Sequence, residues 1–310
     1  MAKTKTKTRT RARPLRKTDK RYRRYEREIA RIGGEQIIAA RDAIRAIIVP
    51  KIDPSGPSED FSPIRFVPVF YDADQDRLSL FDMLTEQVKA QFLGRLSENK
   101  IKGKLQNVFQ QIGGTVDADI LKQIGRETMA INQGPSRKII DRAINETTSS
   151  LTGNTTSFVD KVKARITSGV SANETNKSLS KGVQEMLTSN GDTVEGAKNK
   201  AKFIARNAVS RSLGALNEEK QTALGIELYT WETADDERVR PTHKDLDGKI
   251  FSWDGVTILN GEKYYPAIDP DFNDGAPTTP GQPWNCRCVG RAYSPEMDLE
   301  SNQKSPLGFL

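Results

Sequence analysis

The sequence predicts an α+β protein, with a predominantly α-helical N-terminal part followed by a small C-terminal β-meander module. Upstream of residue 226, aromatic residues are sparse and apolar side chains recur every three or four positions, as they do on helices. Between residues 228 and 289, short alternating runs are separated by Asp-Gly and Asn-Gly pairs, which is typical of strands joined by tight turns. The single histidine, both cysteines and all three tryptophans lie in this second stretch.

Residues 1–25 form a basic arm for which we predict disorder. They hold twelve Lys/Arg and one acid, a net charge of +11, so residues 26–310 carry −4 of the total of +7. Such a segment repels itself and buries no apolar surface. Cations at this density neutralise DNA phosphates without reading sequence, although a solubilising or targeting tail is the alternative. The candidate DNA-binding residues are Lys3, Lys5, Lys7, Arg9, Arg11, Arg13, Arg16, Lys17, Arg21, Arg23 and Arg24; Tyr22 and Tyr25 could also stack on bases.

Residues 26–190 are predicted to be helical, apart from a Pro-rich linker over 50–77. The first helix runs from Tyr22 to Val49, with a weak point at Gly33-Gly34, and ends at Pro50. The linker holds a short candidate edge strand, Arg65–Tyr71, because Pro68 cannot donate to a central ladder. Helical spacing also predicts helices over 78–112 (stopping at Gly113-Gly114), 117–132, 136–151, 156–168 and 173–188.

The C-terminal domain is predicted to span residues 191–293, leaving 294–310 as a tail. A capping box at Asp192 and Glu195 opens its helix, which ends at Gly225. Strands are expected at 226–231, 249–253 and 256–259, and residues 266–283 are expected to be irregular. The turn signals are Asp247-Gly248, Asp254-Gly255 and Asn260-Gly261.

Several spaced motifs in this domain resemble the Mu F-like family of phage head-morphogenesis, or minor head, proteins. They are Ala205-Arg-Asn207, Asp235-x-x-Arg238-x-Arg240-x-x-His243, Leu246-x-Gly248 and Pro283-Trp-Asn-Cys-Arg-Cys288, together with Trp231. The resemblance covers residues 195–293 and implies a low-copy protein inside the capsid near the portal, with a role in procapsid assembly and in DNA packaging or delivery. Its structural motif residues here are Trp231, Arg238, Arg240, Gly248, Asn285 and Arg287.

The resemblance also implies the partners and the location. We expect contact with the portal protein and, non-specifically, with double-stranded DNA; the major capsid protein or a scaffolding protein is a further candidate. The expected location is the capsid interior of the virion, after assembly in the host cytoplasm. No apolar run approaches the roughly 18–20 residues that span a bilayer, and no apolar h-region follows the basic N-terminus, so no membrane association is expected.

Zn²⁺ is the candidate cofactor, although no cofactor is certain. His243, Cys286 and Cys288 supply three borderline or soft ligands, and Asp235 or Asp247 could supply the fourth. One residue between the cysteines is fewer than structural zinc sites usually have. In the alternative without metal, His243 hydrogen-bonds within a turn and the cysteines pack as small apolar side chains.

The arginines near these residues also allow two interpretations. Arg238, Arg240 and Arg287 could bind phosphate through their guanidinium groups. Because several acids lie close by in sequence, including Asp235 and Asp236, we favour ion pairs that hold long loops in one shape.

No catalytic residues are assigned. A nuclease of the His-Asn-His type needs more than one histidine, and the chain has neither a Gly-x-Ser-x-Gly elbow nor a phosphate loop. We therefore expect a protein that is not an enzyme. The alternative is a metal-dependent DNA-processing enzyme built on His243, Cys286 and Cys288.

Overall fold

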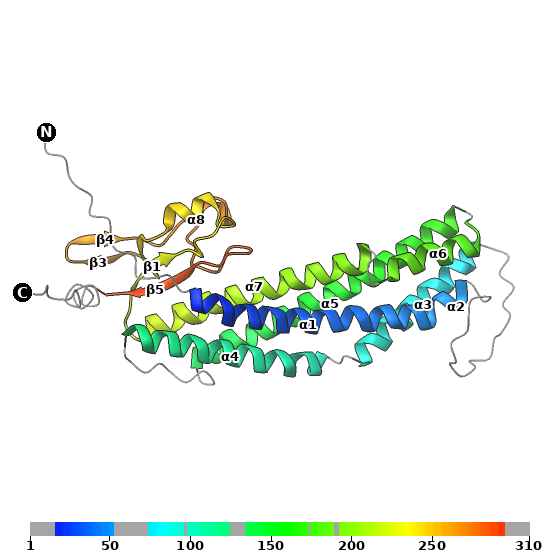
Figure 1. Cartoon of the computed structure of the whole chain (residues 1–310), viewed down its shortest axis with the longest axis horizontal. Coiled ribbons are helices and arrows are strands. Elements are labelled where there is room, and N and C mark those ends of the chain that lie inside the picture. Colours follow the sequence, from blue (N-terminus) through cyan, green and yellow to red (C-terminus); the bar gives the residue numbers. More distant parts are fainter. Residues whose placement is uncertain are drawn as a thin grey trace, which may run out of the picture. The chain divides into compact units, whose positions relative to one another are not determined.

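The computed structural model describes residues 16–52, 74–95, 98–124, 134–172, 174–188 and 192–294, and these have the predicted α+β fold (Figure 1). The helices are α1 (Arg16–Ile47), α2 (Val49–Ile52), α3 (Asp74–Arg95), α4 (Glu98–Ile124), α5 (Gly134–Ser171), α6 (Asn176–Leu187), α7 (Asp192–Ala223) and α8 (Pro241–Leu246). The strands are β1 (Leu228–Glu232), β2 (Ile250–Ser252), β3 (Thr257–Leu259), β4 (Glu262–Tyr264) and β5 (Val289–Tyr293), and a 3₁₀ turn covers Asn273–Gly275. In this part of the chain no helix is both long enough and apolar enough to cross a membrane.

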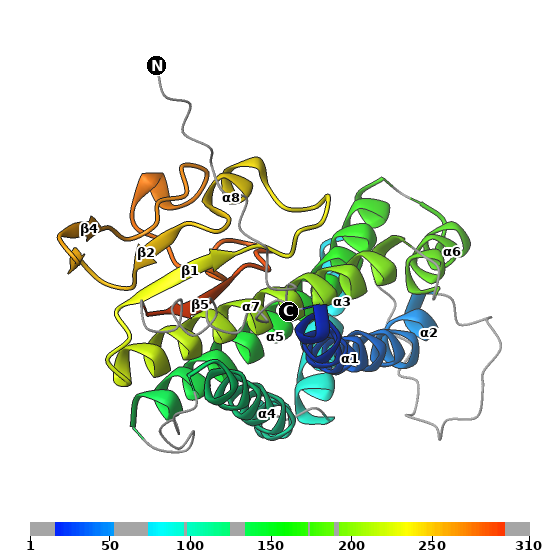
Figure 2. The same ribbon diagram turned by 60° about the vertical axis from the view of Figure 1, so that its left-hand side comes forward.

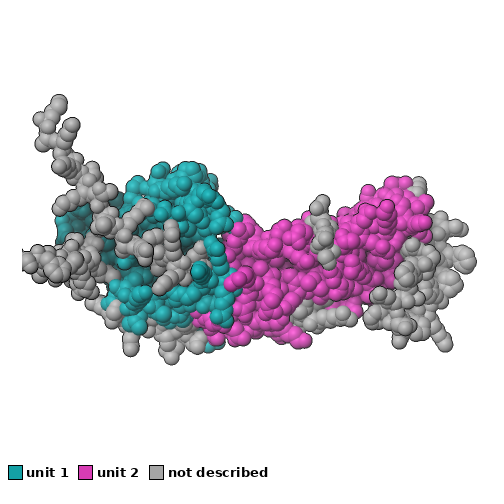
Figure 3. Space-filling view, in the orientation of Figure 1, with its two compact units in different colours: residues 1–25, 112–137, 209–310 teal, residues 26–111, 138–208 magenta. Residues whose placement is uncertain are grey.

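The chain divides into two compact units (Figure 3). The helical unit comprises residues 26–111 and 138–208, and the C-terminal unit comprises residues 1–25, 112–137 and 209–310. Each unit therefore draws on stretches that are distant in sequence. The boundaries between them fall inside α1, α4, α5 and α7.

The helical unit is held together by an aliphatic core to which six of its helices contribute. Buried side chains from α1, α2, α3, α5, α6 and α7 form one cluster, which includes Ile44, Phe81, Phe158 and Val183. Gly33 lies where α1 comes closest to its neighbours: a Cβ there would be 2.7 Å from Leu151 Cδ2 and 2.9 Å from Ala201 Cβ. The Gly33-Gly34 pair therefore does not break α1, because a residue without a side chain is what this close packing needs.

Several predicted helix boundaries are wrong. The first helix, α1, ends at Ile47, and Pro50, which was expected to end it, lies within α2. The helix expected over 78–112 is two helices, and the second of them, α4, continues through the expected stop at Gly113-Gly114 to Ile124. The segments 136–151 and 156–168 form one helix, α5. The hydroxyls of Thr148 and Thr155 in α5 donate hydrogen bonds to the carbonyls four residues earlier. The side chain of Asn154 donates to Ala197 O of α7 at 2.8 Å. These polar residues are satisfied within the helix and do not end it.

The last part of the predicted basic arm is helical, because α1 begins at Arg16. Tyr22 and Arg21 both hydrogen-bond Asp119 of α4, at 3.1 and 2.9 Å, and the hydroxyls of Tyr25 and Thr115 are 2.9 Å apart. Burial raises the pKa of Tyr22 well above its usual range. These contacts fix both tyrosines against α4, so the suggestion that they stack on bases is not supported. Residues 1–15 and the candidate strand over 65–71 lie outside the described residues.

The C-terminal unit contains two small antiparallel sheets. The three-stranded sheet has the order β2-β1-β5, with Leu228 opposite both Ser252 and Tyr293, so the last strand lies beside the first and a simple meander is not formed. The strands β3 and β4 form a separate hairpin. Its turn, Asn260-Gly261, has φ angles of 52° and 82°, as the predicted tight turn requires. The strand β5 and the helix α8 were not predicted.

The three-stranded sheet packs on the C-terminal part of α7 (Figure 2). Gln221 of α7 is fully buried; its Nε2 donates to Gly290 O at 2.9 Å, and its Oε1 accepts from Trp253 Nε1 at 3.1 Å. Next to it, the fully buried ammonium of Lys220 pairs with Asp117 of α4 at 2.6 Å. The outer edge of β5 is therefore hydrogen-bonded to a side chain of α7. This packing fixes the start of β5, which directly follows Cys288.

Candidate metal centre

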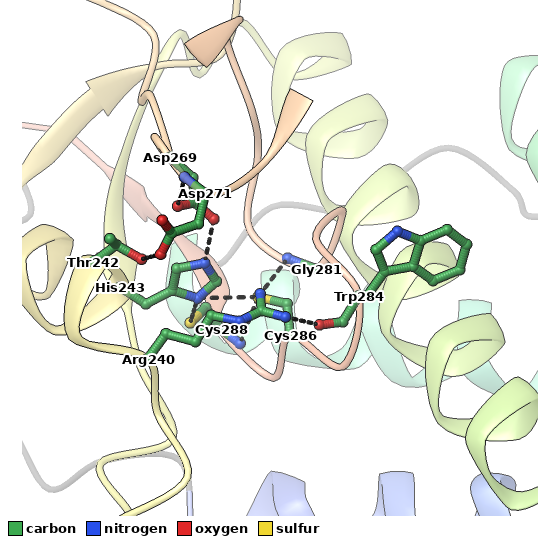
Figure 4. Close-up of polar contacts among 9 residues, drawn as sticks. All are labelled: Arg240, Thr242, His243, Asp269, Asp271, Gly281, Trp284, Cys286 and Cys288. Atoms are coloured by element: carbon green, nitrogen blue, oxygen red, sulfur yellow. Dashed lines mark hydrogen bonds and ion pairs between the residues drawn. The ribbon is translucent and has the colours of Figure 1, made fainter. Parts of the chain in front are cut away.

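The histidine and both cysteines of the chain meet in the C-terminal unit (Figure 4). His243 lies on α8, a short helix that begins at Pro241, where a proline is well tolerated. Cys286 and Cys288 lie in the segment just before β5. The ring of His243 packs edge-on against buried Trp231 of β1, with the ring centres 5.4 Å apart. Helix α8 and the sheet thus place the imidazole next to the two sulfurs.

All three donor side chains are buried and close together. His243, Cys286 and Cys288 are 2%, 3% and 5% exposed. His243 Nδ1 lies 3.7 Å from Cys286 Sγ and 3.4 Å from Cys288 Sγ, and the three donor atoms lie within 4.8 Å of one another. This group could hold a metal ion.

Asp269 lies on the other side of the imidazole. Its Oδ2 is 2.8 Å from His243 Nε2, its Oδ1 accepts from Asp271 N at 3.1 Å, and its side chain is fully buried. The side chain of Asp271 is in turn bonded to Thr242 of α8 (Figure 4). Sequence reasoning missed Asp269, because it lies in the turn-rich segment over 266–283, where neither periodicity nor spacing marks one acid among several.

The two thiols differ in their surroundings. Cys286 Sγ accepts from the backbone N–H groups of Gly281 and Cys288, each at 3.4 Å. The hydrogen bond with Cys288, followed by the contact with His243, holds the pKa of Cys286 well below its ordinary value in spite of burial. For Cys288, the hydrogen bond with Cys286 and burial raise the pKa well above the usual range.

The carboxylate of Asp269 and the imidazole of His243 stabilise each other's charged forms. Burial alone would lower the pKa of His243, but its contacts with Cys286 and Asp269 outweigh burial and raise that pKa. Burial would raise the pKa of Asp269, yet the hydrogen bonds with His243 and with the N–H of Asp271 lower it. The site therefore favours an ionised Asp269.

The carboxylates predicted as a fourth ligand lie elsewhere. Asp235 is exposed in a left-handed turn with φ of 51°. Asp247 Oδ1 accepts from the N–H and the hydroxyl of Thr233, at 2.9 and 3.0 Å. Within the described residues, neither belongs to the group of converging donor atoms.

The predicted motif residues hold the loops around the site. Arg287 forms two hydrogen bonds of 2.6 Å to Asp236, which also accepts from Arg238 at 3.3 Å, and Arg240 donates to Trp284 O at 2.7 Å (Figure 4). The two bonds from Arg287 are the main reason that the pKa of Asp236 lies well below its usual range.

Backbone conformation accounts for two further motif residues. Gly248 and Asn285 both have positive φ angles, 74° and 56°. The N–H of Gly248 bonds Trp231 O at 2.8 Å, which closes the long connection between β1 and β2. Asn tolerates the left-handed region better than most residues, and here it precedes Cys286.

Most of the predicted DNA-binding residues are not part of any site that the structure describes. Lys3 to Arg13 lie outside the described residues, and Arg16 and Lys17 begin α1. Arg21 pairs with Asp119, and Arg23 and Arg24 are exposed on α1.

In the C-terminal unit, α8 and the segment before β5 thus supply a buried Cys₂His group. Residues 160–291, from within α5 to β5, match the family described as Phage Mu protein F like protein, so the chain contains a Mu F-like domain over these residues. The resemblance expected over 195–293 is confirmed, and the matched region begins earlier. This family implies a head-morphogenesis or minor capsid protein.

A relative from Haemophilus influenzae (strain Rd), described as an uncharacterized protein, is 31% identical over 132 residues. The aligned segment is 43% of this chain and 24% of that protein, so the chain spans about a quarter of the relative's length. No solved structure matches this chain.

Proposed function

We propose that this protein is a minor head protein of a tailed bacteriophage and acts in head morphogenesis. The match of residues 160–291 to the Mu F-like family carries this proposal. In this role the protein is incorporated during procapsid assembly in the host cytoplasm, and it remains inside the capsid near the portal.

The basic arm supports contact with packaged DNA. Residues 1–25 carry a net charge of +11, whereas the rest of the chain carries −4. A segment with this charge attached to an acidic body binds phosphates electrostatically, while the body is free to bind a protein partner. We propose the portal protein as that partner, with the major capsid or a scaffolding protein as further candidates.

The C-terminal module acts as a rigid scaffold and not as a catalyst. Its His243, Cys286 and Cys288 are each at most 5% exposed, so a DNA phosphate cannot reach them in this conformation. The alternative function, a metal-dependent DNA-processing enzyme, is favoured only by the convergence of the same three side chains. It predicts DNA cleavage that is lost when Cys286 is replaced by serine.

Co-purification with the portal protein tests the assembly role. The full chain is expressed together with the portal protein of the same phage, and the complex is isolated through a tag on the portal. We expect the two proteins to elute together in size-exclusion chromatography. Recovery of the chain as a lone monomer that cleaves DNA would refute the proposal.

The salt dependence of DNA affinity tests the arm. Replacing the six Lys/Arg of residues 1–15 by glutamine leaves α1 intact. Because each neutralised phosphate contributes about 0.9 to the slope of log K against log salt, we expect the slope for duplex DNA to fall by about 5. Exchanging threonines 4, 6, 8 and 10 for serine, as a control, should leave the slope unchanged. An equal slope in the glutamine variant would show that the arm does not bind DNA.

A further inference from the structure

The two nitrogen–sulfur separations fit one tetrahedral zinc ion, and the two sulfurs lie within 4.8 Å of each other. With Zn–S bonds of about 2.3 Å and a Zn–N bond of about 2.0–2.1 Å, the tetrahedral angle puts the ligand nitrogen about 3.6 Å from each sulfur. His243 Nδ1 lies 3.7 Å from Cys286 Sγ and 3.4 Å from Cys288 Sγ. The two observed separations lie on either side of the value that a shared ion requires.

Both sulfurs face the same nitrogen of the His243 ring. An ionised carboxylate only accepts hydrogen bonds, so the 2.8 Å contact with Asp269 places the ring proton of neutral His243 on Nε2. With His243 neutral, as a metal ligand must be, Nδ1 presents a single lone pair towards the two sulfurs. A metal ion bound by that lone pair and by both sulfurs uses all three donors.

The surroundings of the ligands are those of a metal site. Histidines that bind metals generally donate their other ring N–H to a carboxylate, which sets the ring orientation and raises the basicity of the ligand. Asp269, fully buried, occupies this place. Cys286 Sγ also accepts two backbone N–H groups, from Gly281 and Cys288. Such donors stabilise the negative charge of a thiolate.

Trp231 supplies a further polar group at the same place. Its side chain is fully buried against His243, and its indole N–H has no hydrogen-bond partner. A buried, unpaired donor is costly, and two metal-bound thiolates next to it would offset that cost.

We propose that His243 Nδ1, Cys286 Sγ and Cys288 Sγ bind one Zn²⁺ ion and that Asp269 is a positioning residue for the histidine ligand. Within the described residues no fourth His, Cys or acid joins this group. The ion ties α8 to the segment that leads into β5 and so stabilises loops that have little regular structure. The zinc site does not depend on the proposed role in the phage head.

The same residues suggest one rival arrangement. Cys286, His243 and Asp269 are in the order of a thiol nucleophile, its base and the acid that orients the base. A nucleophile must reach its substrate, but Cys286 is only 3% exposed. In addition, this arrangement gives no role to Cys288, which lies closer to the imidazole than Cys286 does.

Metal analysis of the untagged full chain tests the proposal. After reduction, reconstitution with Zn²⁺ and removal of excess metal, we expect about one zinc ion per chain by elemental analysis. Replacement of zinc by Co²⁺ should give the absorption of a tetrahedral cobalt site with thiolate-to-metal charge transfer. Cys286→Ser and Cys288→Ser should abolish both signals. A chain without stoichiometric zinc and without the cobalt spectrum would overturn the proposal.

A matched pair of variants tests the role of Asp269 where the cysteine variants fail to fold. Asp269→Asn removes the carboxylate that orients the imidazole, and zinc affinity measured against a chromophoric chelator should fall about 10–100-fold. Asp274→Asn makes the same chemical change at an exposed position of the same segment, and it should leave the affinity unchanged. Equal affinities for the two variants would refute the role of Asp269, and alkylation of Cys286 at the rate of a free thiol in zinc-loaded protein would favour the rival arrangement.

Discussion

Neighbouring glycines on α1 should respond to the same substitution with opposite signs. Alanine at an interior helical position is about 0.5–1 kcal/mol more favourable than glycine, because it restricts the unfolded chain. At Gly34 an added Cβ meets no atom within 4 Å. Gly34→Ala should therefore raise the free energy of unfolding by up to about 1 kcal/mol.

At Gly33 the same methyl group would overlap two others. It would lie 2.9 Å from Ala201 Cβ, which is fixed to the backbone of α7, and 2.7 Å from the Leu151 methyl carbon Cδ2. Carbon atoms pack at about 3.5–4.0 Å, and overpacking a core costs about 1–3 kcal/mol. After the helical gain is subtracted, Gly33→Ala should lower the free energy of unfolding by about 0.5–2 kcal/mol.

Urea denaturation followed by far-UV circular dichroism measures both changes. All three tryptophans belong to the C-terminal unit, so their fluorescence reports on that unit. We expect the circular dichroism midpoints of the two variants to lie on opposite sides of the wild-type midpoint. If Gly33→Ala stabilises the protein as much as Gly34→Ala does, the close approach of α1, α5 and α7 is incorrect.

Three further predictions concern the C-terminal unit. Gln221→Leu leaves the indole N–H of Trp253 without its acceptor and should lower the free energy of unfolding by about 1–3 kcal/mol. The tryptophan fluorescence transition should then occur at a lower urea concentration. Lys220→Met leaves a part-buried carboxylate without its cation and should cost a similar amount in the same assay, whereas a change below about 0.3 kcal/mol would contradict the ion pair. Because Arg287 lowers the folded pKa of Asp236, this carboxylate stabilises the fold above its unfolded pKa and loses that effect as the pH falls towards the folded value. We expect wild type and Asp236→Asn to differ in free energy of unfolding by about 1 kcal/mol or less after solvent screening, measured with a metal chelator present. This difference should shrink below about pH 4. A difference that stays constant with pH would contradict the effect of Arg287 on Asp236.

The parts of the fold that sequence reasoning found are those determined locally. Asn260-Gly261 forms the expected hairpin turn, and Gly225 ends α7 with φ of 76°, because both depend on backbone conformations that few residues adopt. Gly113-Gly114 was wrongly read as a helix end. There α4 continues with buried Ile112 and Val116 on either side, so tertiary packing overrides the low helix propensity of glycine.

The site was found only in part, for a related reason. His243, Cys286 and Cys288 stand out because they are rare in this chain, and rarity can be read from a sequence. Asp269 is one of many acids, and its role follows from its distance to a ring nitrogen. The strand β5 was missed because it is short and pairs with β1, some sixty positions earlier, so no local pattern shows its partner.

The ion pair between Lys220 and Asp117 has a consequence for anyone who wishes to excise the Mu F-like region. The segment from residue 160 to 291 includes the lysine but leaves its aspartate behind, and the side chain of that lysine is fully shielded from water. A fragment cut at these two residues thus buries a lysine without its carboxylate partner, and a transplanted module needs the end of α4 supplied with it.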